Sequence, residues 1–208
     1  MRQAVLASLL LIVAMMAVGT ARAQALGAGE CRIPEAERER LLALDIEAFD
    51  RTASGGWRPW FEAGCLADTA ALIEAYMAAH PDHAGNDREL HFHAAQVHAF
   101  RGDYAAARAH LRHASYPEDR RDPSRPDAWN VYMRATDAFL ARDRDALAGI
   151  YRQMGGEDEG EAAAEPHSLF GPPPRRRKRM PYLDVVRGLL ACFDRPYGEA
   201  YDAACRAQ

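Results

Sequence analysis

The chain has 208 residues, with 30 acidic and 26 basic side chains and a formal net charge of −4. This length suits a single domain with its own hydrophobic core, and the mildly acidic balance argues against nucleic-acid binding. The sequence contains no nucleotide-binding loop, no cysteine with the Cys-x-x-Cys or Cys-x-x-His spacing of a zinc site, and no recognisable nucleophile constellation. Composition and motifs therefore point to no particular enzyme class.

Residues 1–23 have the features of an export signal. Arg2 provides an early positive charge, an apolar run covers 4–18, and residues 21–23 form the small-x-small ending that signal peptidase prefers. The apolar run is shorter than the roughly 20 residues of a membrane-spanning helix, so a retained anchor is the less favoured alternative. We expect residues 24–208 to form one domain with no membrane span and a net charge of −6, in the periplasm or secreted.

The four cysteines of an exported chain are expected to form disulfides, because exported proteins meet an oxidising environment. Three pairings are possible. A first helix over 34–51 and a short antiparallel return over 57–63 would place Cys31 and Cys65 at the same end of that pair. This arrangement favours a Cys31–Cys65 bridge.

The remaining pair, Cys192 with Cys205, is harder to join. If Cys205 lies about nine residues into a continuous final helix, the rise of that helix separates the two cysteines by roughly 13 Å. Disulfides need Cα atoms within roughly 7 Å of each other. A Cys192–Cys205 bridge is therefore expected only if the last helix is irregular.

The clearest helical pattern runs from Glu89 to Ala114 and predicts two helices folded back on each other. Gly102 can end the first helix, and Asp103 can cap the free N–H groups of the second. Small and apolar residues then recur at helical spacing, at Tyr104, Ala107, Leu111 and Ala114. The stretch resembles a tetratricopeptide-repeat (TPR) hairpin, in which a Gly-x-Tyr turn precedes a small residue, a large apolar residue and an alanine.

Degraded copies of this hairpin flank it on both sides. A shift of 38 residues lays Gly64 over Gly102 and Ile73 over Leu111, which predicts a helix within 64–76. A shift of 40 residues gives an apolar helical stripe, with Asp143 at the following turn. The stripe consists of Trp129, Tyr132, Met133, Thr136, Phe139 and Leu140.

A last copy begins at Tyr182, with an apolar stripe that reaches Phe193. Asp194 and Pro196 are expected to cap and start a single final helix that continues through Ala204. The resemblance implies an all-α fold in which about four antiparallel helix pairs stack into a right-handed solenoid.

A long connection over 155–180 separates the third and fourth pairs. Acidic residues gather in 157–165, and prolines followed by basic residues fill 172–179. This length exceeds the roughly 12–15 residues of ordinary connections, so we expect a mobile charged loop. The acidic residues can neutralise the basic run, which favours a solvated loop over a segment that binds anions.

Seven of the eight histidines fall between His80 and His113. On a helix His91 and His93 point about 200° apart, so they cannot chelate one ion together. The pairs that can share a helix face are His91 with His98 and His110 with His113, and neither has an evident third ligand. We therefore expect no bound metal and no other cofactor.

Comparison of the copies selects a different candidate site. The 40-residue shift lays His93 over Met133 and Gln96 over Thr136, so polar side chains replace an apolar and a weakly polar one. His93 and Gln96 are three residues apart and can share one helix face. Burying them unpaired would be costly, so they need partners, either within the stack or in a ligand.

Three residues at the start of the next predicted helix could supply aromatic and amide contacts to the same site. The alternative is that they are core and helix-capping residues. They are Trp129, Asn130 and Tyr132.

The TPR resemblance implies a binding function, because the first helices of successive TPR pairs line a concave surface that takes peptides or partner proteins. We expect an exported module that binds a protein or peptide in the cell envelope and is not an enzyme. One alternative is a small hydrolase or metal-dependent enzyme that uses His93, although no nucleophile, base and orienting group are evident together. The other is a structural component of an envelope assembly.

Overall fold

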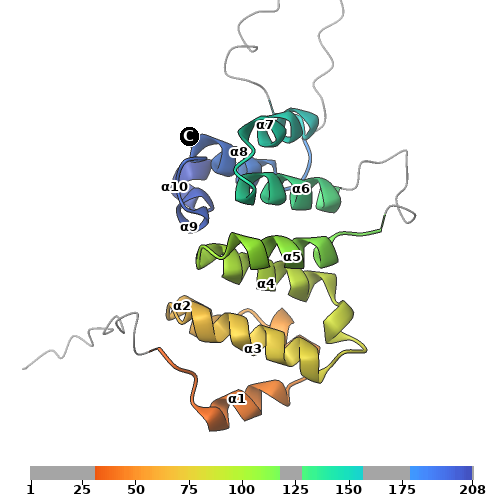
Figure 1. Ribbon diagram of the computed structural model, residues 1–208, viewed down its shortest axis with the longest axis vertical. Helices are drawn as coiled ribbons and strands as arrows, with labels where there is room; N and C mark the ends of the chain where they lie inside the picture. Colours follow the sequence, from red (N-terminus) through yellow and green to blue (C-terminus); the bar gives the residue numbers. More distant parts are fainter. Residues whose placement is uncertain (1–30, 118–127, 157–178, 208) are drawn as a thin grey trace, which may run out of the picture.

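The computed structural model describes residues 31–117, 128–156 and 179–207 (Figure 1). Throughout these ranges the regular structure is helical and contains no strand, which confirms the predicted all-α class. The predicted signal peptide and most of the predicted loop over 155–180 lie outside the described residues. Among the described helices, none is both long and apolar enough to cross a membrane.

The helices lie in successive layers along the long axis of the molecule (Figure 1). In chain order they are α1 (Glu35–Leu42), a π-helical turn (Glu47–Arg51), α2 (Arg58–Glu62), α3 (Leu66–Ala79), a 3-10 turn (Ala84–Asn86), α4 (Arg88–Phe100), α5 (Tyr104–Ala114), α6 (Ala128–Leu140), α7 (Arg144–Gln153), α8 (Leu183–Ala191), α9 (Tyr197–Ala200) and α10 (Ala203–Arg206).

The predicted hairpin is formed by α4 and α5. Gly102 has a φ of +80°, and the Asp103 carboxylate accepts a hydrogen bond from the N–H of Ala106, as expected for a left-handed turn followed by an N-cap. The residues aligned with Gly102 by the 38- and 40-residue shifts, Gly64 and Arg142, also have positive φ, at +82° and +59°. The same turn therefore precedes α3, α5 and α7.

The predicted helix over 34–51 is wrong, because the chain bends after α1 and resumes as a π-helical turn. Carbonyl groups at the bend bond to α3 and not to the next turn of a helix. The Tyr76 hydroxyl donates to the carbonyl of Leu44 at 2.8 Å, and His80 Nε2 donates to the carbonyl of Leu42 at 2.9 Å. Tertiary hydrogen bonds to α3 thus replace helical ones, and the bend turns Asp50 toward α4.

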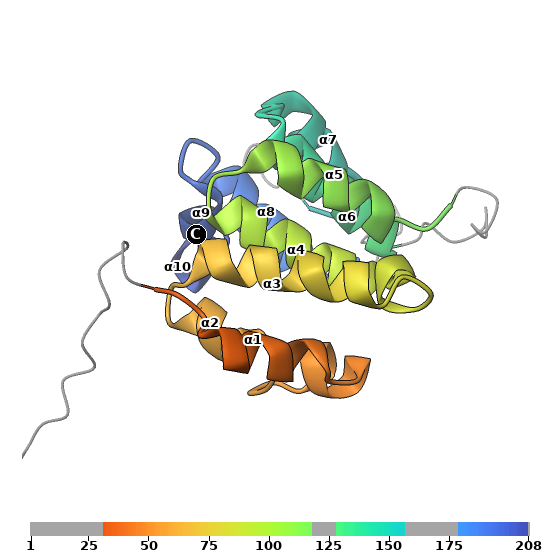
Figure 2. The same ribbon diagram turned by 60° about the horizontal axis from the view of Figure 1, so that its bottom comes forward.

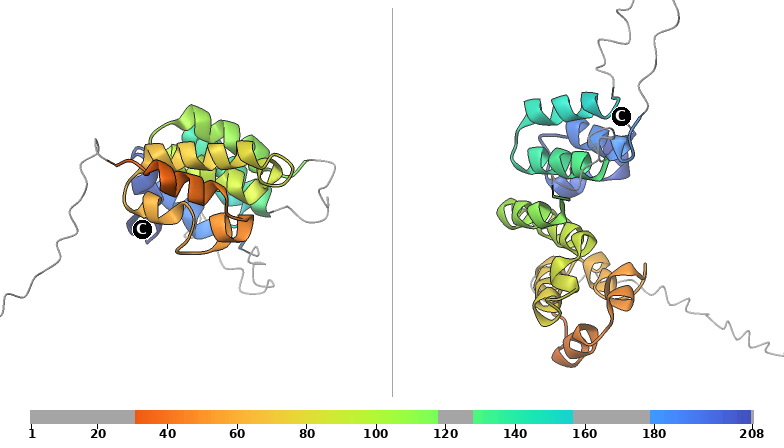
Figure 3. Two further views of the ribbon diagram at one scale, coloured as in Figure 1. Left: turned by 90° about the horizontal axis from the view of Figure 1, so that it is seen from below. Right: turned by 90° about the vertical axis from the view of Figure 1, so that its right-hand side faces the viewer.

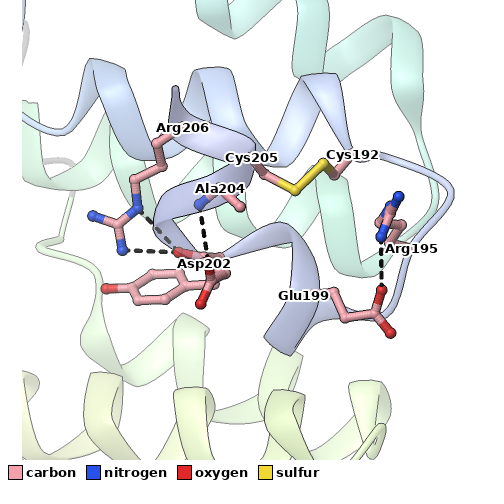
Figure 4. Close-up of a disulfide and its surroundings, with 8 residues drawn as sticks. Cys192, Arg195, Glu199, Asp202, Ala204, Cys205 and Arg206 are labelled. Carbon is pink, nitrogen blue, oxygen red and sulfur yellow. Dashed lines mark hydrogen bonds and ion pairs between the residues drawn. A yellow bond between two sulfur atoms is a disulfide. The ribbon is translucent and has the colours of Figure 1, made fainter. Parts of the chain in front are cut away.

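The predicted single final helix is also wrong. It breaks between α9 and α10, where Asp202 is extended and its carboxylate accepts from the N–H of Ala204 (Figure 4). The N-cap position of α9 is taken by Pro196. Asp194, which was expected to cap this helix, is exposed and lies 3.8 Å from a guanidinium nitrogen of Arg142.

This break brings the last two cysteines together. The Cα atoms of Cys192 and Cys205 are 6.0 Å apart and the side chains form a disulfide (Figure 4). The predicted Cys31–Cys65 disulfide is also present, with a Cα separation of 5.2 Å. Both bridges fit an oxidising environment outside the cytoplasm.

The central helix α4 is apolar on two sides, because it packs against a hydrophobic core on each. Leu90, Ala94 and Val97 belong to the core of α1–α3, while Ala95 and Ala99 belong to the core of α5–α10. Figure 3 shows α4 and α5, in green, between α1–α3 and the helices from α6 onward. The polar residues of α4 therefore lie along the two sides of the helix between these apolar faces. We call these two sides the seams of α4, and their polar residues define the candidate sites.

Candidate functional site

One seam of α4 carries His93 beside a buried carboxylate. Asp50 is fully buried in the π-helical turn, and its Oδ1 atom accepts from His93 Nδ1 at 2.8 Å and from the indole N–H of Trp57 at 2.8 Å. The Arg58 guanidinium lies 3.8 Å from the same oxygen and also donates to the Asp50 backbone carbonyl. Donors from two other segments thus converge on one carboxylate.

These contacts decide the charge of Asp50. Burial alone would raise the pKa of this carboxyl group, but the hydrogen bonds from His93 and Trp57 and the charge of Arg58 outweigh burial and lower the pKa below its usual 3.8. Asp50 is therefore ionised at neutral pH. In a neutral His93 ring whose Nδ1–H donates to Asp50, Nε2 is the acceptor.

The same seam continues through Gln96 and Phe100. Gln96 is half-buried and its amide lies near the hydroxyl group of the fully buried Tyr197, which makes no hydrogen bond to the described residues. Phe100 packs edge-on against Phe61 of α2 at 5.1 Å and against Tyr197 of α9 at 5.5 Å, measured between ring centroids. The face of α4 that carries His93 and Gln96 is therefore bordered by α2 on one side and α9 on the other.

The structure separates the other predicted site residues. Trp129 donates its indole N–H to the carbonyl of Ala114 at 2.8 Å, and Asn130 is buried with its amide bonded to both backbone groups of Tyr116. Both residues therefore bond to the end of α5 and to the residues directly after it. Their described contacts match the core and cap roles given above as the alternative.

Tyr132 is buried as well, but it lies nearer to Gln96. Its ring stacks on Tyr182 at 4.7 Å, and its hydroxyl group interacts with Tyr197 and Tyr201. Burial, with these neighbouring hydroxyls, raises the pKa of Tyr132. Gln96 and Tyr132 thus border one cluster of buried tyrosines, which the 40-residue repeat alignment did not predict.

The opposite seam of α4 holds a second polar cluster, built from three helices that run side by side (Figure 2). His98 Nε2 of α4 lies 2.8 Å from Glu74 Oε1 of α3, and His110 Nε2 of α5 lies 3.9 Å from the same oxygen. His91 of α4 adjoins the cluster, with Nδ1 3.0 Å from His110 Nδ1 and Nε2 3.0 Å from the carbonyl of Gly85.

Burial and the neighbouring imidazoles keep His91 and His110 neutral. Burial, followed by the effects of His91 and His98, lowers the pKa of His110 from 6.5 to about 4. Burial is also the main reason that the pKa of His91 is lowered. At neutral pH both rings therefore carry a lone pair that can accept a hydrogen bond or bind a metal ion.

Asp50 and Glu74, the two carboxylates that define these seams, were not predicted from the sequence. The histidine pairs that could share a helix face were His91 with His98 and His110 with His113, each within one helix. The structure instead pairs His98 with His110 across the hairpin and adds Glu74 from α3. For Glu74, the feature of the sequence that could have indicated its role is its position on the predicted helix within 64–76, on the side that faces the α4–α5 hairpin.

Comparisons with known protein families, with curated proteins and with solved structures return no match for this chain. The proposals that follow therefore rest on the chain's own residues.

Proposed function

We propose that this protein is an exported TPR-like solenoid that binds a peptide segment of a partner protein in the cell envelope along the face of α4 that carries His93 and Gln96. The observation that carries this proposal is the pairing of His93 with buried Asp50, at 2.8 Å, while the imidazole keeps 16% of its surface exposed. A buried carboxylate thus fixes the orientation of a side chain that solvent, and therefore a ligand, can reach.

The polar groups on this face can form hydrogen bonds with the main chain of a peptide bound in an extended conformation. With Nδ1–H directed at Asp50, Nε2 of a neutral His93 accepts a hydrogen bond, and the Gln96 amide can both donate and accept. The two residues are three apart, a rise of roughly 4.5 Å along the helix, which is similar to the spacing of peptide groups in an extended chain. Half-buried rings beside them, Phe61, Phe100 and Tyr201, offer contacts for apolar side chains.

The repeated turns before α3, α5 and α7 support the solenoid part of the proposal. In a solenoid each helix pair buries its faces against its neighbours, and the first helices share one side. The two disulfides support export, and a periplasmic or secreted location follows if residues 1–23 are a cleaved signal.

A crosslinking experiment in the native envelope tests this proposal. Wild-type protein, His93→Ala and Gln96→Ala are crosslinked and recovered, with Arg112→Ala as the matched control because Arg112 is exposed on α5. We expect one partner to be recovered with wild type and Arg112→Ala and to be lost with the other two variants. A synthetic peptide from the crosslinked segment should bind His93→Ala about tenfold more weakly, the equivalent of one lost hydrogen bond.

Two results would contradict peptide binding at this face. Recovery of the same partner with all variants would favour the structural role in an envelope assembly, with a contact surface elsewhere. Cleavage of the peptide that disappears with His93→Ala would favour the hydrolase, because Asp50 and His93 supply the base and orienting group of such an enzyme. Circular dichroism of each variant checks that the helical fold is retained.

A further inference from the structure

We propose that Glu74, His98 and His110 form a binding site for a transition-metal dication of the Zn²⁺ class, on the seam of α4 opposite His93. One nitrogen or oxygen atom from each side chain lies within 4.8 Å of the other two. The two distances to Glu74 Oε1 are 2.8 Å from His98 Nε2 and 3.9 Å from His110 Nε2. This site is separate from the peptide-binding face and does not depend on it.

These distances are close to those of a zinc site. Zinc bonds of about 2.1 Å in a tetrahedron place neighbouring ligand atoms roughly 3.4 Å apart. The Glu74 oxygen must therefore move away from His98 and toward His110 by roughly half an ångström, and the two imidazole nitrogens, which lie within 4.8 Å of each other, must also come to about 3.4 Å. The Glu74 side chain is 50% exposed and free to make this movement, while His98 is 5% exposed and held in place.

A chain of hydrogen bonds sets the tautomer of His110. The Gly85 carbonyl only accepts, so Nε2 of neutral His91 donates to it and Nδ1 of His91 is left as an acceptor. That atom faces His110 Nδ1 at 3.0 Å, so His110 donates from Nδ1. The lone pair of His110 is consequently on Nε2, the atom that faces Glu74. His91 therefore orients a ligand in the way that carboxylates and carbonyls orient histidines in known metal sites.

A carboxylate also lies near the other ring nitrogen of His98, beyond hydrogen-bonding distance. Its Nδ1 atom is buried and makes no hydrogen bond, and it lies 3.6 Å from Asp103 Oδ2. Without metal, His98 Nε2–H donates to Glu74. When a metal ion takes the Nε2 lone pair, the ring proton moves to Nδ1, where the Asp103 carboxylate can accept it after a small movement. Metal binding thus gives a partner to a buried nitrogen that otherwise has none.

The ligand set favours zinc and related ions over calcium and magnesium. Two imidazoles and one carboxylate suit Zn²⁺, Ni²⁺ or Cu²⁺, whereas Ca²⁺ and Mg²⁺ prefer oxygen ligands. Three protein ligands leave a fourth position, on the exposed side of Glu74, for water or for a group from a partner. The site joins α3, α4 and α5, so an ion bound here ties the two cores together.

Zn²⁺ titration of the purified mature protein tests the site. Isothermal calorimetry should show one equivalent bound by wild type, with about a 100-fold loss of affinity in Glu74→Gln and in His110→Ala. His113→Ala is the matched control, because His113 is exposed and its ring lies 4.9 Å from His91 without belonging to the ligand set. Its affinity should remain within threefold of wild type.

A second measurement does not depend on affinity. One equivalent of Zn²⁺ should raise the melting temperature of wild type and His113→Ala but not of Glu74→Gln, which keeps its fold because Glu74 is exposed. Nitrogen NMR should show the Nε2 signals of His98 and His110 shift on binding. Absence of stoichiometric binding, or binding that His113→Ala weakens as much as Glu74→Gln does, would overturn the proposal. Neither result would affect the crosslinking outcome at His93.

Discussion

Asp50 places a full negative charge inside the protein, where no part of its side chain reaches solvent. A buried charge is costly unless donors and opposite charges replace the lost water, and Trp57, His93 and Arg58 do so at Oδ1, whereas the buried Oδ2 atom makes no hydrogen bond to the described residues. Trp57 and Arg58 come from the start of α2, and His93 comes from α4. The carboxylate therefore joins the bend after α1 to α2 and α4.

Replacing Asp50 with Asn tests the contribution of this charge. The amide oxygen can still accept from one donor, so we expect a loss of about 2 kcal/mol in the free energy of unfolding at neutral pH. The folded-state pKa of Asp50 lies below its unfolded value of 3.8. The stabilisation is therefore complete above that value and is lost as the pH falls through the lower, folded-state pKa.

Urea unfolding between pH 6 and pH 2.5 at constant ionic strength measures this dependence. The difference between wild type and Asp50→Asn should be constant down to about pH 4 and shrink below it. Asp82→Asn serves as the control, since Asp82 is exposed. A difference that stays constant throughout the range would mean that the pKa of Asp50 is the same in the folded and unfolded protein, which would contradict the lowered folded-state pKa.

At the scale of the helices, the repeated unit is the turn rather than the apolar stripe. Gly64, Gly102 and Arg142 each adopt a positive φ directly before the N-cap of a long helix. Arg142 is the only one of the three with a side chain, and its guanidinium lies 4.4 Å from the ring centroid of Phe193 and 5.3 Å from that of Phe139. A cation–π contact thus offsets part of the backbone cost that glycine avoids at the other two turns.

A pair of glycine substitutions separates backbone strain from packing. Gly102→Ala should destabilise the protein by about 1 kcal/mol, because its φ is +80° while the added Cβ would meet no atom within 4 Å. Gly149→Ala, inside α7, should stabilise it by about 0.5–1 kcal/mol, because alanine favours the helix and the nearest atom is 4.0 Å away. Thermal unfolding measures both, and equal effects of the two substitutions would contradict this assignment of the turn.

At the scale of the whole molecule, α4 belongs to both hydrophobic cores. Its apolar residues belong to the core of α1–α3 on one side and to the core of α5–α10 on the other. Figure 3 shows the helices stacked in layers on both sides of it. An interface of this kind couples the two halves, because neither half can lose α4 without exposing apolar surface. We therefore expect the described helices to unfold in one cooperative transition.

Leu90→Ala tests this coupling. Leu90 is fully buried in the core of α1–α3, and truncation should cost about 2–5 kcal/mol. In a background where Trp57 and Trp60 are replaced by Phe, Trp129 reports on the other core alone. The fluorescence of Trp129 and the helical circular dichroism should shift to lower urea together. A Trp129 transition that stays in place would show that the two cores unfold separately.

The sequence by itself determined the features that depend on neighbours within one or two helical turns. Apolar spacing located α3, α4, α5, α6, α7 and α8, and the Gly102–Asp103 pair located the central turn. The Cys31–Cys65 bridge was also predictable, although the long first helix assumed for it is wrong. In each case the physical cause is local: side chains three or four residues apart share a face, and a residue with positive φ ends a helix.

The tertiary structure alone decided which polar groups meet. Asp50 reaches His93 across 43 residues of chain, and Glu74 reaches His98 across 24, so no periodic pattern connects them. The bend that turns Asp50 toward His93 arises where tertiary hydrogen bonds replace helical ones, at Leu42 and Leu44 beside α3. The break that joins Cys192 to Cys205 has a local cause, because the side chain of Asp202 caps the next turn and interrupts an otherwise helical sequence, but only the fold shows that the break brings the two cysteines together.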